Sequence, residues 1–231
     1  YMTWQGKKQY GFTFDQANTL FILLVTASII GGKFFLIFEN PSLYLGHPGK
    51  LISGSGFVFY GSLLFAIPTM LWYFRKYRLP VRGMLDIMAV VTCLVHGMGR
   101  IGCLMAGCCY GKPTVHAFGI TFTNPACQAN PLNVALHPTQ IYEAMLIFIL
   151  MAVLLFLRSR KRFDGQLFLI YLMSYAVGRG VLEMFRGDLQ RGFLIKDILS
   201  HSQFISLLII AVAMFVYVKW NRKGTFGSSK H

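Results

Sequence analysis

The chain has 231 residues, of which 55% are hydrophobic and only 13% are charged, and its formal net charge is +14. A soluble domain carries about twice this share of charged residues, so the composition excludes an ordinary water-facing surface and indicates contact with lipid. The positive charge does not indicate nucleic-acid binding, because the basic residues lie in short clusters between apolar runs.

Six apolar runs are long enough to cross about 30 Å of hydrocarbon as helices. In chain order they cover 19–38, 57–74, 84–107, 141–157, 167–185 and 203–218. We therefore expect an all-α integral membrane protein with a single membrane domain over 1–231. The connection 108–140 is the longest, and long connections are usually functional, so we expect a small cap there. Residues 224–231 are typical of a flexible tail or an expression remnant.

The basic residues of the connections lie next to alternate ends of the expected helices. They are Lys7, Lys8, Arg75, Lys76, Arg78, Arg82, Arg158, Arg160, Lys161, Arg162, Lys219, Arg222 and Lys223. If all six helices span the membrane, these clusters share one face, and an excess of Lys and Arg marks the cytoplasmic face. We therefore expect both ends of this chain in the cytoplasm and 39–56, 108–140 and 187–202 on the outer side.

Ionisable residues inside a span are costly and usually line an interior site. Arg100 lies deep in the third run and Glu143 opens the fourth, while Arg179 and Glu183 share one face of the fifth. One interpretation is structural ion pairing, either of Arg179 with Glu183 or of Arg100 with its neighbour in the fourth run. The other is recognition of a phospholipid phosphate, because the planar guanidinium fork matches phosphate oxygens.

Four segments resemble the motifs of a known family. They are Gly97-Met98-Gly99-Arg100-Ile101-Gly102 with Gly107 and Gly111, Leu136-His137-Pro138-Thr139-Gln140-Ile141-Tyr142-Glu143, Tyr175 through Arg186, and Ser202-Gln203. The glycines around Arg100 favour either close helix packing or the approach of a lipid headgroup to the backbone. Together with Gly31-Gly32-Lys33 and Phe59-Tyr60-Gly61-Ser62-Leu63, the segments resemble prolipoprotein diacylglyceryl transferases over roughly residues 12–220.

The resemblance implies the fold of a family with seven spans, of which the first is missing here. It also implies a reaction at the outer face of the bacterial inner membrane. The diacylglyceryl group of phosphatidylglycerol moves to the thiol of a lipoprotein-precursor cysteine, and glycerol phosphate leaves. No metal or organic cofactor is expected.

The resemblance also assigns roles to the candidate site residues. Arg100 and Arg179 would bind and polarise the departing phosphate. Three charged residues would orient them, namely Glu143, Glu183 and Arg186. The substrate site would be lined by Gly99, His137, Gln140 and Tyr142.

Three positions depart from the family pattern. Tyr60 stands where the family has an important histidine, so it becomes the candidate catalytic residue there, although a phenol with a pKa near ~10 is a poorer base. Cys103 replaces an asparagine and Cys108 replaces a glutamate. These changes leave open a different acceptor, a lipid-binding or lipid-moving protein without the chemistry, or a membrane thiol redox protein.

The chain has five cysteines, namely Cys93, Cys103, Cys108, Cys109 and Cys127. The first two are expected as small buried helix residues. The last three fall on the expected outer side, where Cys127 could form a disulfide with either neighbour in the pair Cys108 and Cys109. A metal site with His116 or His137 as the fourth ligand is an alternative, although the paired Cys-x-x-Cys spacing of structural zinc is missing.

Overall fold

The computed structural model describes residues 1–39, 41–46, 49, 58–187, 193–195 and 199–227. By their internal contacts these residues form two compact units, Tyr1–Met84 and Leu85–His231. Helices make up almost all of the regular structure, which confirms the all-α class, and the strands are two short pairs. Each unit is described separately below.

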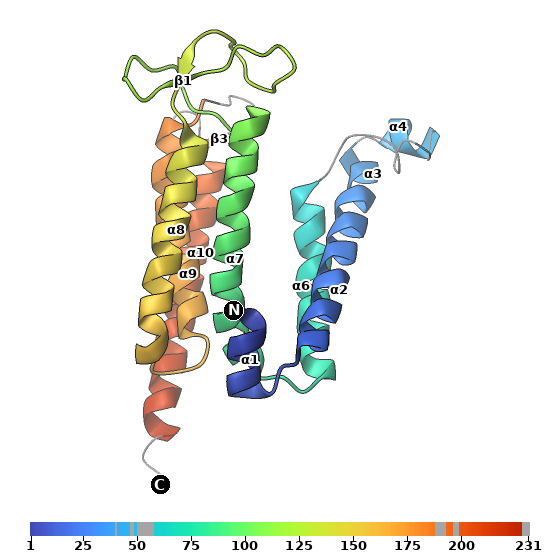
Figure 1. The fold of residues 1–231 in the computed structure, drawn as a ribbon, viewed down its shortest axis with the longest axis vertical. Helices are drawn as coiled ribbons and strands as arrows, with labels where there is room; N and C mark the ends of the chain where they lie inside the picture. The colour runs from blue at the N-terminus through green and yellow to red at the C-terminus, as the bar shows by residue number, and fades with distance from the viewer. Residues whose placement is uncertain (40, 47–48, 50–57, 188–192, 196–198, 228–231) are drawn as a thin grey trace. The chain divides into compact units, whose positions relative to one another are not determined.

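The first unit is built around a helix pair (Figure 1). Its elements are α1 (Met2–Tyr10), α2 (Phe14–Phe34), α3 (Leu36–Glu39), α4 (Pro41–Gly46) and α6 (Phe59–Lys76). A capping box starts α2, because the Thr13 hydroxyl accepts from Gln16 N at 3.3 Å while Gln16 Oε1 accepts from Thr13 N at 3.0 Å. This arrangement satisfies two backbone N–H groups at the helix start.

Glycines allow α2 and α6 to approach closely. A Cβ atom added at Gly31 would collide with the carbonyl oxygen of Gly61, and one added at Gly61 would collide with that of Gly31. Beside them, the Ser62 hydroxyl donates to the Ser28 carbonyl oxygen at 2.8 Å. Small residues that bring backbones together are the usual contact between membrane helices, so these two motif segments have a packing role here.

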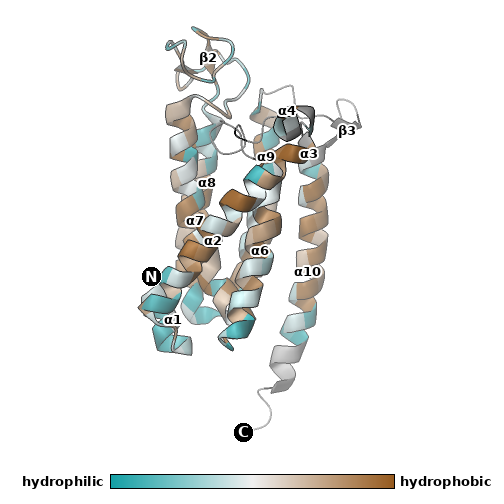
Figure 2. Ribbon diagram, turned by 90° about the vertical axis from the view of Figure 1, so that its right-hand side faces the viewer, coloured by the Kyte–Doolittle hydropathy of each residue, from teal (hydrophilic) through white to brown (hydrophobic). Residues whose placement is uncertain are grey.

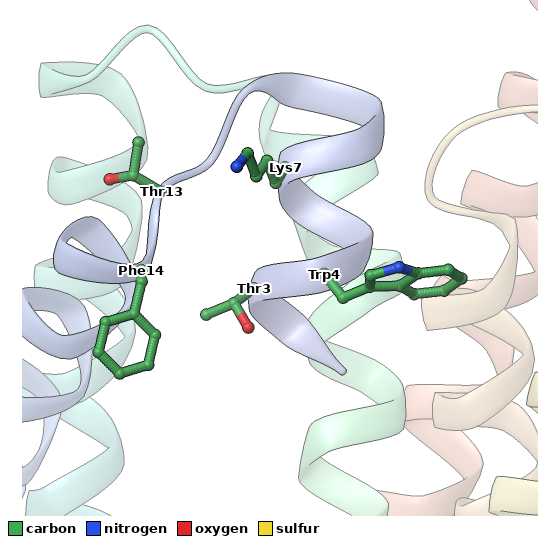
Figure 3. Close-up of a pocket in the computed structure, with 5 residues that line it drawn as sticks. All are labelled: Thr3, Trp4, Lys7, Thr13 and Phe14. Atoms are coloured by element: carbon green, nitrogen blue, oxygen red, sulfur yellow. The ribbon is translucent and has the colours of Figure 1, made fainter.

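A pocket of about 270 Å³ lies where α1 meets the start of α2. Figure 3 shows its lining residues, which are Thr3, Trp4, Lys7, Thr13 and Phe14. None of them belongs to the motif segments.

The second unit is a helical bundle with a loop cap at one end (Figures 1 and 2). The boundary between the units falls in the first turn of α7 (Val81–Ala106), after Met84. The other elements of the second unit are β1 (Ile120–Thr121), β2 (Ala135–Leu136), α8 (Thr139–Leu157), η1 (Arg158–Arg160), α9 (Gln166–Leu182), η2 (Glu183–Phe185), β3 (Phe193–Ile195), β4 (Leu199–Ser200) and α10 (His201–Gly227). The buried core joins the first three helices of the bundle and consists of Ala89, Val90, Cys93, Ile147, Leu150, Leu154, Leu167 and Tyr171. The expectation that Cys93 is a buried helix residue is thereby confirmed.

The outside of the bundle is apolar, as expected for a surface that faces lipid. On α10, for example, Leu207, Val212 and Phe215 are exposed by 58%, 58% and 68%. Figure 2 shows the middle of this helix in the brown of hydrophobic residues. Such a continuous exposed apolar surface would aggregate in water and is stable in a bilayer.

Within the described part of the chain, five helices have the length and hydropathy to cross a membrane. They cover Phe14–Phe38, Val81–Ala106, Thr139–Arg160, Gln166–Phe185 and Ser202–Arg222. They match five of the six expected spans, and the protein is therefore a multi-pass membrane protein. The expected span 57–74 corresponds to α6, whose 18 residues include Arg75 and Lys76 at its end. These charges lower its mean hydropathy, so this span stays a prediction.

A buried carboxylate fastens α7 to the start of α9. Asp86 is 2% exposed, and its oxygens accept hydrogen bonds from Gly165 N at 3.0 Å, Phe168 N at 3.1 Å and Lys161 Nζ at 3.1 Å. The first N–H groups of a helix have no partner within the helix, and a carboxylate satisfies them well. Asp86 is thus a helix cap supplied by a neighbouring helix.

The cap follows α7 and contains one short antiparallel strand pair. Ile120 of β1 pairs with Leu136 of β2, and Thr121 pairs with Ala135. The cap lies over the end of the bundle at which α7 ends and α8 begins (Figure 1). A second antiparallel pair, β3 with β4, leads into α10.

Candidate active site

The carboxylate of Glu143 is the centre of a buried polar cluster at the capped end of the bundle. Glu143 lies one turn into α8 and is 2% exposed. Its Oε1 atom lies 2.9 Å from Arg100 Nη2 and 3.5 Å from His96 Nε2, and it accepts a 2.8 Å hydrogen bond from the Tyr175 hydroxyl. One oxygen therefore holds side chains of both α7 and α9, and a buried carboxylate needs such partners to remain charged.

Arg179 and Glu183 form a second ion pair where α9 passes into η2. Arg179 Nη1 lies 2.6 Å from Glu183 Oε2, four residues further along the chain. The two atoms are close but do not have hydrogen-bond geometry, so the N–H groups of Nη1 point elsewhere. Both ion pairs that the spacing suggested, this one and that of Arg100 with Glu143, are present.

Two buried guanidinium donors lack an acceptor among the described residues. They are Arg100 Nε and Arg179 Nη1. The charges of both arginines act on the carboxylate of Glu143. Buried donors are nearly always satisfied in native proteins, and a guanidinium donor suits the oxygens of an anion such as phosphate. The binding of a phosphate by this cluster stays a prediction.

The start of α8 is fastened to the loop that follows α7. Thr139 Oγ1 donates to the Cys109 carbonyl oxygen at 2.6 Å, and Gln140 Nε2 donates to the Cys108 carbonyl oxygen at 2.6 Å. Gln140 is 1% exposed, and its Oε1 atom has no donor among the described residues. Because Gln140 and Glu143 are three residues apart on one helix face, this oxygen faces the same side as the arginine cluster.

An aromatic group closes the cluster on the cap side. His137 Nδ1 lies 3.3 Å from the Tyr142 hydroxyl. The ring of Phe185 stands edge-on to both, with centroid distances of 5.6 Å to His137 and 6.2 Å to Tyr142. These contacts bring His137 and Tyr142 next to the end of α9, where Glu183 lies. Their binding of substrate stays a prediction.

Arg186 directs its charge toward a thiol of the same loop. It is 7% exposed, and its guanidinium donates a hydrogen bond to Cys109 Sγ. Burial raises the pKa of Cys109, but Arg186 and the charge of Arg100 outweigh burial and bring this pKa below its usual value. Burial and the neighbouring Cys109 raise the pKa of Cys108 to about 12. The expected role of Arg186 in orienting the other arginines stays a prediction.

The glycines around Arg100 divide between the two roles considered for them. A Cβ atom at Gly97 would meet the ring of Phe148 at 2.6 Å, so this glycine serves the packing of α7 against α8. Gly99 and Gly102 are exposed and have no neighbour within 4 Å of an added Cβ. Their open face leaves room for a ligand beside the arginine.

Two other candidates are described by their own surroundings. Tyr60 lies at the start of α6 in the first unit and is 68% exposed, and its catalytic place stays a prediction. Cys127 packs against Gly107, and its Sγ atom would lie 3.2 Å from a Cβ atom added at this glycine. All five cysteines are free thiols, so the pairing of Cys127 with Cys108 or Cys109 also stays a prediction.

Sequence reasoning missed three members of this region. One is His96, whose Nε2 atom lies 3.5 Å from Glu143 Oε1 and whose ring stands edge-on to that of Tyr175 at 5.1 Å. Its position one turn before Arg100 was the available signal. Tyr175 carried no signal beyond its place in a motif. Cys103 was expected to be a small helix residue, but it lies with Cys108 and Cys109 in a group of thiols that could hold a metal ion.

Comparison with known proteins gives one consistent result. The family model described as "Prolipoprotein diacylglyceryl transferase" matches residues 1–219. A phosphatidylglycerol–prolipoprotein diacylglyceryl transferase of Clostridium tetani is 38% identical over 211 residues, which are 91% of this chain and 83% of the relative. Relatives of that name from Clostridium perfringens (numbered 2) and Dehalococcoides mccartyi are 34% and 31% identical, covering 90% and 95% of this chain and 80% and 83% of their own lengths. The chain belongs to the prolipoprotein diacylglyceryl transferase family.

Proposed function

We propose that this chain transfers the diacylglyceryl group of phosphatidylglycerol to the cysteine thiol of a lipoprotein precursor. The observation that carries the proposal is the pair of buried guanidinium donors, Arg100 Nε and Arg179 Nη1, which lack acceptors among the described residues. The names of the relatives state the same donor and the same acceptor class. Family membership and an anion-binding cluster therefore support one activity.

The chemistry assigns a clear task to the two arginines. The acceptor sulfur forms a bond to the terminal glycerol carbon of the diacylglyceryl group, and the bond from that carbon to the phosphate oxygen breaks. The electron pair stays on glycerol phosphate, whose negative charge therefore grows in the transition state, and the thiol proton leaves to solvent or a base. Preformed cationic donors at the phosphate stabilise this charge most in a site that excludes water.

Glu143 and Glu183 hold the arginines in place for this task. Glu143 takes one N–H group of Arg100, and it leaves the Nε–H group for the phosphate. Glu183 neutralises Arg179 without satisfying Nη1 as a hydrogen-bond donor. Each guanidinium is thus oriented by a carboxylate while it keeps a donor for the substrate.

Charge distribution in the second unit supports an extracytoplasmic site in the bacterial inner membrane. The 3₁₀ turn η1 after α8 and the last turns of α10 lie away from the cap (Figure 1), and they carry Arg158, Arg160, Lys219 and Arg222. Basic clusters mark the cytoplasmic face, so the cap and the arginine cluster would face the outer side. The donor lipid would enter from the outer leaflet and the precursor from the outer surface.

A transfer assay tests the proposal. Purified protein is mixed with phosphatidylglycerol labelled in its acyl chains and a peptide that contains a lipoprotein cysteine motif. We expect label on the peptide cysteine, a loss of about 100–1000-fold in Arg100→Ala, and no loss in Arg160→Ala, which removes an exposed arginine of η1, beyond the other end of α8.

The other outcomes decide between the alternatives. Release of glycerol phosphate without label on the peptide would replace the precursor with another acceptor, a change that the substitutions Cys103 and Cys108 favour. Bound lipid without any turnover would identify a lipid-binding or lipid-moving protein and overturn the proposed transfer.

A further inference from the structure

Three thiols meet at the end of α7, beside the arginine cluster. The Sγ atoms of Cys103, Cys108 and Cys109 all lie within 4.8 Å of one another. Three sulfur ligands around one ion at ~2.3 Å stand about 4 Å apart, so the observed group is close to a ligand set. The sequence gives no regular ligand spacing here, because the three cysteines come from a helix and from the loop after it.

The helix end itself builds the group. The N–H group of Cys108 donates to the Cys103 carbonyl oxygen at 3.1 Å, and that of Gly107 donates to Leu104 O at 3.1 Å. Gly107 has a φ of 68°, in the left-handed region that favours glycine. This is the Schellman motif, in which the N–H group of the second residue after the helix donates to the carbonyl oxygen of the fourth residue from the helix end. Because both of these residues are cysteines, the motif places two thiols side by side.

The third thiol is held in place from the neighbouring helix. Cys109 has a φ of 60°, in the left-handed region, and its Sγ atom lies within 4.8 Å of the other two. The carbonyl oxygens of Cys108 and Cys109 are both fixed, by Gln140 and Thr139 at 2.6 Å each. The backbone of Cys108 and Cys109 is therefore held by two hydrogen bonds from α8. The three sulfur atoms are thus preorganised before any ligand binds.

Two guanidinium groups lie beside the thiols. Arg186 donates a hydrogen bond to Cys109 Sγ, and the charge of Arg100 also acts on it. A divalent ion bound by three thiolates carries a net charge of −1, which these two guanidinium groups would balance. All three thiols are half-buried, so an ion could reach them from the surface.

We infer that Cys103, Cys108 and Cys109 form a three-thiolate binding site for a soft, thiophilic metal ion of the zinc or copper(I) type. Binding ionises the three S–H groups, releases their protons to solvent and changes no oxidation state. Three protein ligands leave one coordination position open, as in metal sites that exchange their ion or bind a further ligand. The inference departs from the sequence expectation of no metal and does not depend on the proposed transfer activity.

Titration with cadmium(II) tests the site, because cadmium binds thiolates and gives an ultraviolet sulfur-to-metal charge-transfer band. The protein is purified in detergent, reduced and freed of metal, and its thiols are counted before the titration. We expect one equivalent of cadmium to bind and zinc to compete for the same place. Helical circular dichroism and elution as a single species serve as folding controls for each variant.

Serine variants identify the ligands. Cys103→Ser, Cys108→Ser and Cys109→Ser should each weaken binding more than the ~10–100-fold that loss of an outer partner costs. Cys127→Ser is the matched control, since it removes another thiol of the cap, and it should bind as the parent does. Folded Cys103→Ser protein that binds cadmium with parental affinity would overturn the inference.

Two further results would also overturn it. One is the absence of a charge-transfer band although all thiols are counted as free. The other is a stable disulfide between Cys103 and Cys108 that, once reduced, still yields no metal binding, which would make the group a redox pair. A disulfide between adjacent Cys108 and Cys109 is strained and is not the expected product.

Discussion

Replacement of Glu143 by glutamine separates the orienting role of this residue from its bulk. The side chain keeps its shape, and its carbonyl oxygen still accepts from the Tyr175 hydroxyl, which now lies 2.8 Å from the carboxylate. What disappears is the negative charge 2.9 Å from Arg100 Nη2. Arg100 then loses the partner that fixes its guanidinium, and its buried charge is left unpaired.

The expected effect falls mainly on kcat. Removing one donor at a developing anionic charge costs about 100–1000-fold, or ~2.7–4 kcal/mol of transition-state stabilisation, and a disoriented Arg100 should approach this loss. The free energy of unfolding should fall by no more than ~3–5 kcal/mol, the cost of breaking a buried pair, because the Tyr175 hydrogen bond remains. KM for phosphatidylglycerol should change less than kcat, since the phosphate charge grows during the reaction.

Steady-state label transfer to the peptide, measured over a range of donor lipid, gives both constants. Asp164→Asn is the control, because it neutralises a carboxylate that is exposed by 47% in the turn between η1 and α9, and its kinetics should equal those of the parent. Folded Glu143→Gln protein with kcat within about threefold of the parent would refute the orienting role.

Further substitutions test the packing of α2 against α6, the ion pairs at the start of α9, and the hydrogen bond from Gln140 to the loop after α7. Gly61→Ala should destabilise the first unit by about 1–3 kcal/mol through collision with α2, whereas Gly102→Ala on an open helix face should not, as thermal unfolding will show. Burial lowers the pKa of Lys161, but Asp164 and Asp86 outweigh it and raise this pKa above its usual value. Its stabilisation should therefore be complete below about pH 10 and disappear at higher pH, a dependence that unfolding measurements should not find in Lys161→Met. Gln140→Met should free the Cys108 carbonyl and increase labelling of Cys108 by a thiol reagent, with the labelled site read by mass spectrometry.

Hydrophobic runs were sufficient to predict most of the fold. Five of the expected spans coincide with long apolar helices because a lipid-facing helix must be apolar over about 20 residues, a signal that needs no tertiary information. The helix α6 is not among these five, since Arg75 and Lys76 at its end lower its mean hydropathy. The strands β1 and β2 are two residues each, too short for any periodic pattern.

The candidate site was predictable where contacts are local or where the choices were few. Arg179 and Glu183 are one turn apart, so their pairing follows from helix geometry. The pair of Arg100 with Glu143 connects two helices and was only one of several possible combinations. Tyr175 and His96 join the same carboxylate through the rotation of α7 and α9 about their axes, which side-chain packing decides and sequence spacing does not.

The thiol group shows what local backbone chemistry adds. A glycine after an apolar run, as at Gly107, is a signal for a left-handed helix end, and that end determines which residues meet. Cys103 and Cys108 have the separation that this motif brings together, so their contact was readable from the sequence. The addition of Cys109 was not, because it depends on the hydrogen bonds from Thr139 and Gln140.

The account depends most directly on the binding of a phosphate by Arg100 and Arg179. Phosphorus-31 NMR of substoichiometric phosphatidylglycerol bound to the purified protein measures this contact. The account predicts a bound resonance shifted from that of free lipid, and a return toward the free position in both Arg100→Gln and Arg179→Gln but not in Arg160→Gln. A bound resonance that is the same in all four proteins would contradict it.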